Sequence, residues 1–300
     1  MNIEGKTIAV TGASGMLGVY ICRALLKKKA RVIGVVRDVN KAAFLKAEGV
    51  EFRKADLMDV HALEKAFDEC DAIVSNAALY RLTNFDWESN YQANKIGTEN
   101  VFVAAAKNRI QRAIQISTVG LYQFNFTQEI TERSMQVKGE EKEGGAYRAT
   151  KQLSEALAWK LCNEHAIRLT TLRPSAVYGA RDTNIMPYIK MAMLLPFIPM
   201  PALGWPFVYA DDVAHAVTSA LENDASVGEA YNTAGDHHDF ADFLEAWHQA
   251  SGKGANILKI PLGVSVKISN AKAERDLNFQ NRRFVDALKE IFSEEPSLLA

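Results

Sequence analysis

The chain has 300 residues, of which 48% are hydrophobic and 24% are charged, and its formal net charge is −1. These values are typical of an ordinary globular protein that is long enough to bury a large core. A nearly neutral chain without a long run of one charge argues against a nucleic-acid groove and against a polybasic membrane arm.

The cysteines and the N-terminal residues bear on the cellular compartment. Cys22, Cys70 and Cys162 are odd in number and form no C-x-x-C pair, so neither disulfides nor a metal site is expected. The first ten residues, MNIEGKTIAV, have no basic region followed by a long apolar stretch, so we expect no signal peptide. Together these features predict a cytoplasmic protein with reduced thiols.

The first half of the chain alternates strand-like runs with helical segments. The runs KTIAV, RVIGVV, VEFRKA, DAIVS, RAIQIS and IRLTTLR are short and rich in β-branched residues, and helices are predicted between them, among them 39–48, 60–69 and 88–108. Such βαβ units build a parallel sheet with helices on both faces. The sequence therefore predicts an α/β fold with a doubly wound parallel sheet.

Beyond about residue 179 the alternation loosens. We expect a helix from Asp211 or Asp212 to about Glu222, a strand near EAYNT, a helix over 239–251 and two more near the C-terminus. Residues 191–208 carry no charge but contain four prolines, which argues against a membrane span. We interpret them as an apolar loop around a pocket, with hydrophobic core or a dimer surface as the alternative.

A glycine-rich turn, VTGASGMLG, joins the first strand to the first helix. Gly12 allows the tight turn, Gly15 lets the backbone approach a pyrophosphate, and Gly18 lets helix and strand pack closely. The N-terminus of the helix offers free N–H groups and a positive dipole to the anion. This placement between strand and helix predicts a dinucleotide site.

The end of the second strand bears on the choice of dinucleotide. Val36 stands where an NAD site usually has an acid, Arg37 follows, and Lys41 lies one turn into the next helix. A guanidinium suits the 2′-phosphate of NADP, so NADP(H) is favoured. Asp38 leaves NAD(H) open, because it could accept from the ribose or only cap the helix.

Two Tyr-x-x-x-Lys pairs occur, Tyr91–Lys95 and Tyr147–Lys151, and their spacing alone does not choose between them. A wider set of motifs along the chain allows the choice between the two pairs. In order along the chain they are TGASGMLG, ADLMD, NAA, NKIGTENV, ISTVGLY, YRATK, LRPSAVYG and FVYADDVAHA. This series resembles the extended short-chain dehydrogenase/reductase family, the NAD-dependent epimerase/dehydratase-like branch, and within it the dihydroflavonol-reductase-like and hydroxysteroid-dehydrogenase-like members.

The resemblance implies a Rossmann-type sheet with a smaller, mostly helical C-terminal substrate-binding region. It implies a dinucleotide-binding domain over 1–178, to which about 207–235 returns, and a substrate-binding region over 179–300. A homodimer through the helices near 88–108 and 146–165 is a family expectation. The implied cofactor contacts, with the residues reasoned above, are Gly12, Ser14, Gly15, Met16, Leu17, Gly18, Arg37, Lys41, Asp56, Leu57, Asn76, Ala77, Ala78, Ser117, Tyr147, Lys151, Pro174 and Val177.

The resemblance also assigns the catalytic residues. Tyr147 follows the fifth strand and becomes the proton-transfer residue, Lys151 holds the nicotinamide ribose, and family register makes Thr118 the catalytic hydroxyl, with Ser117 as the alternative. Tyr147 and Lys151 share one helix face. We expect the nearby ammonium to lower the pKa of the tyrosine towards neutrality.

Departures from the family pattern bear on the reaction and the substrate. Val119 and Gly120 replace the Asp-Glu with which sugar-nucleotide dehydratases eliminate water. The apolar stretch 191–208, with Met191, Met193, Leu194, Phe197, Ile198, Met200 and Trp205, favours a mostly apolar small-molecule substrate. Tyr80, Arg81 and Tyr178 border the expected pocket as candidate substrate contacts. The acidic loop 136–145 before Tyr147 is interpreted as a mobile segment that could act as a lid.

The sequence thus favours an NADP(H)-dependent oxidoreductase that interconverts a ketone or aldehyde and an alcohol, with Tyr147 as general acid and base. An NAD-dependent nucleotide-sugar epimerase is one alternative. A non-enzymatic protein that senses NADP(H) is another, although an intact Tyr147–Lys151 pair speaks against it. No nucleic-acid partner and no membrane span are expected.

Overall fold

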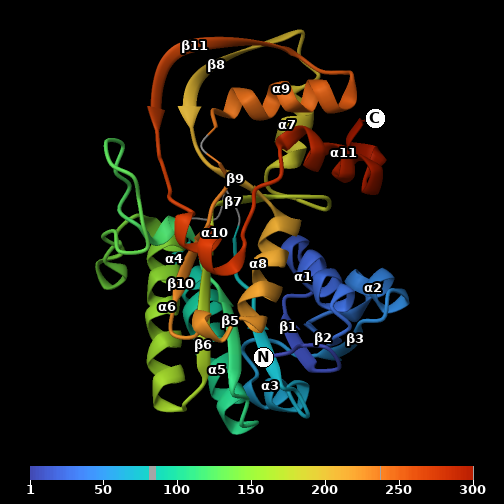
Figure 1. Cartoon of the computed structure of the whole chain (residues 1–300), viewed down its shortest axis with the longest axis vertical. Helices are drawn as coiled ribbons and strands as arrows, with labels where there is room; N and C mark the ends of the chain where they lie inside the picture. Colours follow the sequence, from blue (N-terminus) through green and yellow to red (C-terminus); the bar gives the residue numbers. More distant parts are fainter. Residues whose placement is uncertain (81–85, 237, 300) are drawn as a thin grey trace.

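The computed structural model describes residues 1–80, 86–236 and 238–299. Its centre is a seven-stranded parallel sheet in the order β10-β6-β5-β4-β1-β2-β3 (Figure 1). The strands of this sheet are β1 Thr7–Thr11, β2 Arg31–Val36, β3 Glu51–Lys54, β4 Ala72–Ser75, β5 Arg112–Ile116, β6 Arg168–Pro174 and β10 Ala230–Thr233. Strands β1, β4 and β5 are buried at every position, as expected for a sheet covered on both faces. The predicted Rossmann-type α/β fold is confirmed.

Helices cover both faces of this sheet. One face packs against α3 Val60–Ala66, α5 Gly97–Lys107 and α6 Gly145–Glu164, and the other against α1 Met16–Lys27 and α8 Ala210–Glu222. The helix expected over 39–48 is a 3₁₀ turn, Val39–Ala42, followed by α2 Ala43–Ala47. The helix expected over 88–108 is divided into α4 Trp87–Asn90, a π-helical turn Tyr91–Ile96, and α5.

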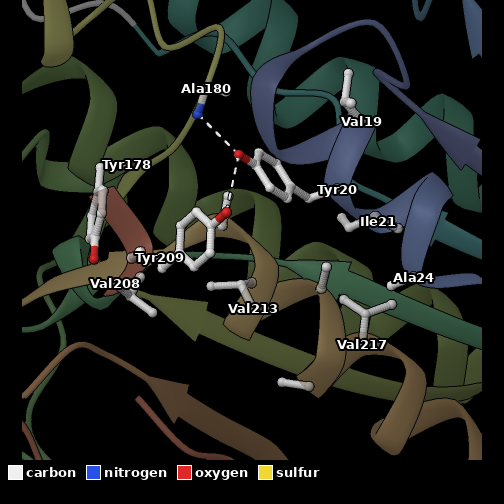
Figure 2. Close-up of a cluster of buried hydrophobic side chains, with 14 of the residues drawn as sticks. Val19, Tyr20, Ile21, Ala24, Tyr178, Ala180, Val208, Tyr209, Val213 and Val217 are labelled. Carbon is white, nitrogen blue, oxygen red and sulfur yellow. Dashed lines mark hydrogen bonds between the residues drawn. The ribbon is translucent and has the colours of Figure 1, made fainter. Parts of the chain in front are cut away.

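The α1–α8 side of the core contains a buried tyrosine pair (Figure 2). The hydroxyl of Tyr20 accepts a hydrogen bond from the backbone N–H of Ala180 at 3.0 Å and lies 3.5 Å from the hydroxyl of Tyr209. The two rings meet edge to face, with centroids 5.5 Å apart. The pair ties α1 to the short parallel ladder of β7 Ala176–Tyr178 and β9 Phe207–Tyr209.

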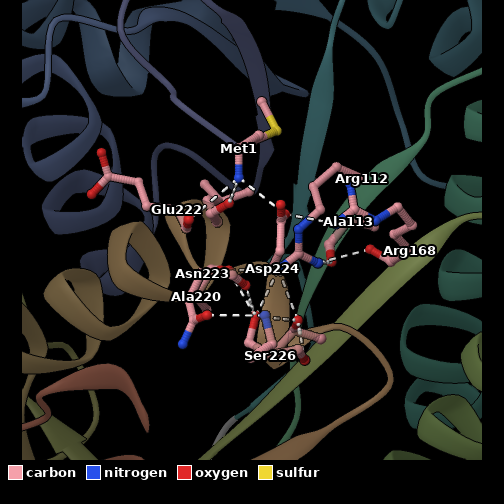
Figure 3. Close-up of polar contacts among 12 residues, drawn as sticks. Met1, Arg112, Ala113, Arg168, Ala220, Glu222, Asn223, Asp224 and Ser226 are labelled. Carbon is pink, nitrogen blue, oxygen red and sulfur yellow. Dashed lines mark hydrogen bonds and ion pairs between the residues drawn. The ribbon is translucent and has the colours of Figure 1, made fainter.

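A buried arginine joins the opposite end of the sheet to α8 (Figure 3). Arg112, only 2% exposed, donates to the carbonyls of Arg168 at 2.7 Å and Ala220 at 2.6 Å. It also donates to the hydroxyls of Thr170 and Ser226. Burial lowers the pKa of Arg112 to about 10. The helix dipole favours a cation at the last carbonyls of α8. The hydrogen bonds of Arg112 thus fix α8 to β5 and β6.

Most of the remaining elements form a lobe at one end of the molecule (Figure 1). They are α7 Met186–Ala192, β8 Phe197–Gly204, α9 Phe240–Ser251, β11 Asn256–Ser265 and α11 Phe284–Glu294, whereas α10 Ala271–Leu277 packs beside β10 and α8. Strands β8 and β11 pair in parallel as a separate two-stranded ladder. The expected apolar loop over 191–208 is therefore wrong in form. Pro199 and Pro201 lie in β8, which pairs with β11 alone among the described strands, and an edge strand of this kind tolerates proline.

Further features complete the fold. The structure has 3₁₀ turns at Val119–Leu121, Gly139–Glu141, Asp224–Ser226 and Pro296–Leu299. Across the described ranges, no helix combines the length and the apolar character that a membrane crossing needs.

Candidate active site

A cavity of about 780 Å³ lies at the carboxyl ends of the central strands, between the sheet and the C-terminal lobe. This edge of a doubly wound sheet is the usual binding place in such folds. Most residues predicted for the cofactor and the chemistry line it. They are Gly12, Ser14, Gly15, Met16, Leu17, Arg37, Asp56, Leu57, Asn76, Ala77, Ala78, Tyr80, Ser117, Thr118, Tyr147, Lys151, Pro174 and Val177.

The glycine turn closes one wall of the cavity. Gly12 has φ +67°, and a Cβ there would lie 2.9 Å from the Cα of Ala77. A Cβ on Gly18 would lie 2.2 Å from the carbonyl oxygen of Gly12, so Gly18 sets the approach of α1 to the turn without lining the cavity. No side chain caps the N-terminus of α1, which leaves its first N–H groups for an anion.

The adenine-ribose end contains one unpartnered cation. Arg37 lines the cavity and makes no hydrogen bond or ion pair with any other described residue. Asp38 is already engaged, because its Oδ1 accepts from the backbone N–H of Asn40 at 3.0 Å and caps the 3₁₀ turn. Asp56 accepts from the N–H of Met58 at 2.9 Å. Lys41, predicted to help hold the cofactor, does not line the cavity.

The other end of the cavity brings together Thr118, Tyr147 and Lys151. The hydroxyl of Thr118 accepts from the N–H of Gly120 at 3.0 Å, and its interaction with the phenol of Tyr147 acts to lower the pKa of that phenol. Lys151 Nζ donates to the carbonyl of Ile116 at 2.8 Å, at the end of β5. The hydroxyl of Ser117 is buried and has no hydrogen-bond partner among the described residues. Thr118 therefore reaches the tyrosine, whereas Ser117 offers a free hydroxyl to whatever fills the cavity.

These donors fit a nicotinamide dinucleotide. The glycine wall leaves room for a pyrophosphate, Arg37 is a free cation at one end, and Ser117 is an orphaned hydroxyl at the other. Buried polar atoms without partners are uncommon, and a ligand commonly explains them. The residues present thus match the group that the glycine motif predicts.

The pKa of Tyr147 differs from the expectation. Burial, with a further contribution from Tyr80, raises the pKa of the phenol, and the hydrogen bond from Thr118 opposes the rise. The Tyr80 ring packs against the Tyr147 ring at a centroid distance of 4.9 Å. The predicted lowering by Lys151 is wrong for this structure, because the ammonium is directed to the Ile116 carbonyl and burial dominates. Burial also lowers the pKa of Lys151 to about 8.

Arg148, next to the tyrosine, fastens the Thr118 turn to α6. Its Nε donates to the carbonyl of Gly120 and its Nη2 to that of Tyr122, both at 2.7 Å. Its guanidinium lies 4.2 Å from the centroid of Phe124, another residue of the cavity wall. The arginine thereby links the turn that bears Thr118 to the helix that bears Tyr147. Sequence reasoning missed it, although it lies inside the YRATK motif.

A buried ion pair supports the same turn from behind. Arg173 and Glu155 pair at side-chain exposures of 5% and 4%, and Arg173 also donates to the hydroxyl of Tyr122 at 2.6 Å. Tyr122 donates in turn to Asn232 at 2.8 Å. Glu155 lies one helical turn after Lys151. Sequence reasoning missed this ion pair, although a glutamate on the buried side of α6 could have indicated it.

The buried asparagine of the NKIGTENV motif lies in the π-helical turn. Asn94 accepts from the N–H of Leu79 at 2.8 Å and donates to the hydroxyl of Thr150 at 3.1 Å. It is 1% exposed and joins the segment before Tyr80 to α6. Single π-turns often mark functional sites.

The acidic segment 136–145 is tied to the Thr118 turn. The N–H of Val137 donates to the carbonyl of Leu121 at 2.8 Å. The carboxylate of Glu143 accepts from the side chain of Gln123 and, at 2.7 Å, from the N–H of Lys138. The segment interpreted as a free loop therefore has defined contacts, and its action as a lid stays a prediction.

The substrate end of the cavity differs from the sequence expectation. Phe124 and Trp205 meet edge to face with centroids 4.9 Å apart, and Asp182 and Asn184 complete this end. Tyr178, expected to touch substrate, is 1% exposed, does not line the cavity, and packs among aromatic rings of the core (Figure 2). That expectation is corrected. Arg81 lies outside the described residues.

Most of the apolar stretch 191–208 also fails to line the cavity. Of the seven apolar side chains expected there, Trp205 alone is a lining residue among those described. Met193 and Ile198 are buried in the core, whereas Met191, Leu194 and Phe197 are exposed. The pairing of β8 with β11 carries this stretch away from the cavity.

Known proteins resemble this chain in sequence and in fold. Residues 8–234 match the model of the NAD dependent epimerase/dehydratase family. Cinnamoyl-CoA reductase 1 of Petunia hybrida is 27% identical over 59% of this chain and 56% of its own length. Sterol demethylase protein B of Methylococcus capsulatus is 26% identical over 92% of this chain and 84% of its own length.

The fold is matched over nearly the full length by a solved structure. It is that of UDP-glucose-4-epimerase from Stenotrophomonas maltophila with bound NAD and formylated UDP-arabinopyranose, with a TM-score of 0.85, 19% identity and 98% of each chain covered. At this identity the likeness concerns the fold alone. The family match covers most of the chain, and it includes the glycine turn, Thr118, Tyr147 and Lys151. This chain therefore belongs to the NAD dependent epimerase/dehydratase family, the extended branch of the short-chain dehydrogenase/reductases that its motifs predict.

Proposed function

We propose that this protein is an NADP(H)-dependent oxidoreductase that interconverts a ketone or aldehyde and an alcohol on a mostly apolar small molecule. The observation that carries the proposal is that Tyr147 and Thr118 line the same cavity as Arg37, whose guanidinium has no partner among the described residues. Thr118, Tyr147 and Lys151 are the proposed catalytic residues.

The raised pKa of Tyr147 suits a proton donor. At neutral pH the phenol keeps its proton, so it can give that proton to the oxygen of a carbonyl that is being reduced. A bound nicotinamide supplies the hydride in this direction and accepts it in the reverse. The hydroxyl of Thr118 then stabilises the phenolate left on Tyr147, since its hydrogen bond favours the charged form. Lys151 adds positive charge nearby.

Two observations support NADP(H) over NAD(H). Arg37 has no partner among the described residues and is free for the 2′-phosphate. Asp38, the residue that left NAD(H) open, uses Oδ1 of its carboxylate to cap the turn at Asn40. Lys41 remains a proposed second cation for the phosphate, although it lies outside the cavity wall.

An apolar substrate is supported by the walls of the reactive end. The Tyr80 ring packs on Tyr147, and Phe124 and Trp205 add two more aromatic rings to the cavity wall. Such rings select apolar ligands. Two of the curated relatives are named for a cinnamoyl thioester and a sterol. Asp182 and Asn184 give this end a polar group for orientation.

The test is to mix the purified protein with NADPH or NADH and a panel of apolar ketones and aldehydes, following the near-ultraviolet absorbance of the reduced cofactor. We expect net consumption of NADPH, with an Arg37→Ala variant losing about tenfold or more in NADPH affinity and little in NADH affinity. Arg109→Ala, a change at an arginine outside the cavity, is the matched control. Interconversion of UDP-sugars without net cofactor consumption would instead establish the epimerase alternative.

A further inference from the structure

Exposed apolar side chains gather on one end of the C-terminal lobe. Among the described residues, seven of the twelve large hydrophobic side chains that are exposed belong to α7, the turn after it, β8 and β11. We call six of them the α7–β8 face: Tyr188 (54% exposed), Met191 (64%), Leu194 (76%), Leu195 (54%), Phe197 (60%) and Leu258 (61%). A cluster of this kind on a folded chain marks an interaction surface.

The α7–β8 face is a firmly anchored projection. Ile189, Met193 and Ile198 alternate with the exposed residues and are buried, at 3%, 5% and 7% exposure. The turn itself is closed by backbone hydrogen bonds from Leu194 to Met191 and from Leu195 to Ala192. The exposed side chains are therefore held outward by a fixed backbone.

The segment that carries most of the face contains a single charged side chain, a lysine. Residues 183–210 contain one lysine and no aspartate or glutamate. Lys253 is exposed. It lies near Met193, since a Cβ on the adjacent Gly254 would be 2.3 Å from the Met193 side chain. Lys190 bonds a backbone carbonyl and no carboxylate. On the neighbouring helix α9, Asp242 and Glu245 both pair with Lys259 of β11, which leaves one negative charge in excess there.

We propose that the α7–β8 face docks this protein on an anionic lipid surface, with the projecting apolar side chains in the headgroup region and Lys190 and Lys253 against lipid phosphates. Apolar side chains flanked by lysines are the features that bind proteins to membrane interfaces without a spanning helix. A second copy of this chain fits less well, because residues 183–210 offer no carboxylate to pair with Lys190 across a symmetric contact.

The position of the face relative to the cavity gives the docking a consequence. Asn184 precedes α7 and Trp205 follows β8, and both residues line the cavity. The segment that meets the lipid is thus connected at both ends to the substrate end. Docking does not depend on the proposed reaction, and a protein without reductase activity would still bind.

The test is sedimentation of the full chain with vesicles of phosphatidylcholine alone and of phosphatidylcholine mixed with phosphatidylglycerol. We expect the wild type to sediment with the anionic vesicles. Leu194→Glu combined with Phe197→Glu should weaken binding by about tenfold or more, since it removes both inserted side chains and adds repulsion. Lys253→Glu should weaken binding to the anionic vesicles in particular.

The matched control is Phe126→Glu combined with Met135→Glu, which changes two side chains of similar exposure, 61% and 71%, outside the face. It should bind as the wild type does. Leu194→Ser with Phe197→Ser serves as a second pair if the acidic pair does not fold. The proposal is overturned if the wild type stays in the supernatant with both vesicles or if control and face variants bind equally. A concentration-dependent dimer that the face variants abolish would also overturn it, in favour of a second copy.

Discussion

The parallel-sheet half and the C-terminal lobe of this protein are built on different principles. In the sheet half the strands are continuous buried runs, and the glycine turn leaves its functional groups on the backbone. In the lobe, β8 and β11 form an edge ladder rich in proline, and the functional groups are aromatic side chains such as Trp205. A substitution in the glycine turn would move the backbone groups that form the site. Exposed positions of the lobe can be substituted without such a shift.

The largest effect is expected where the two halves meet, at Tyr147. Tyr147→Phe removes the proton donor and keeps the ring that packs on Tyr80, so kcat should fall by about 10² to 10⁴ with NADPH affinity unchanged. Steady-state kinetics with calorimetric NADPH titration measure both quantities. Tyr91→Phe, at the other Tyr-x-x-x-Lys pair, is the control and should keep full activity. Loss of NADPH affinity in Tyr147→Phe would indicate a structural role.

Gly18→Ala probes the sheet half alone. Its Cβ would lie 2.2 Å from the Gly12 carbonyl, so we expect a loss of about 3 kcal/mol in the free energy of unfolding, together with weaker NADPH binding. Thermal and denaturant unfolding measure the first quantity. Gly228→Ala has open space around its Cβ, and its φ of +81° should cost only about 1 kcal/mol. Equal costs at both glycines would contradict the close-packing explanation.

Arg148→Met tests whether the turn bearing Thr118 is held by side-chain contacts. The variant removes both bonds to the carbonyls of Gly120 and Tyr122, and we expect kcat to fall by about tenfold with a smaller change in the KM for NADPH. Arg133→Met changes an exposed arginine of the following segment and should leave both constants unaltered. If kcat and the KM for NADPH shift together, the arginine acts on the cofactor end instead.

A smaller effect is expected in the pH dependence of kcat/KM for reduction. Burial lowers the pKa of Lys151 to about 8, so the folded enzyme loses this positive charge as pH rises through that value. Because the charge stabilises the phenolate formed during reduction, kcat/KM for reduction should decline above pH 8. A profile over this range in wild type and Lys151→Met measures it. An unchanged inflection in the variant would assign the titration to another group.

The sheet half was largely predictable from the sequence, because its signals are local. The glycine turn, the β-branched runs and the Tyr147 motif each carry their meaning in a few adjacent residues. The choice of Thr118 over Ser117 as the catalytic hydroxyl came from family register and stays a prediction, since both residues line the cavity.

The lobe and the electrostatics were less predictable, because they depend on distant pairings. The sequence predicted Phe197 and Met191 as pocket residues, but both are exposed on the surface. The pairing of β8 with β11, which the sequence does not report, carries this part of the chain away from the cavity. Tyr178 lies in a family motif, yet its ring joins the core. The pKa of Tyr147 depends on burial beneath Tyr80, which the spacing to Lys151 does not report.

The most direct test of the proposed reaction is isotope transfer. NADPH carrying deuterium at both C4 positions is incubated with the protein and an accepted apolar ketone, and the alcohol is examined by mass spectrometry. We predict one deuterium on the carbinol carbon for each NADPH oxidised, and almost none with Tyr147→Phe over the same time. Alcohol without deuterium, or deuterium transfer that survives Tyr147→Phe at the wild-type rate, would contradict the proposed mechanism.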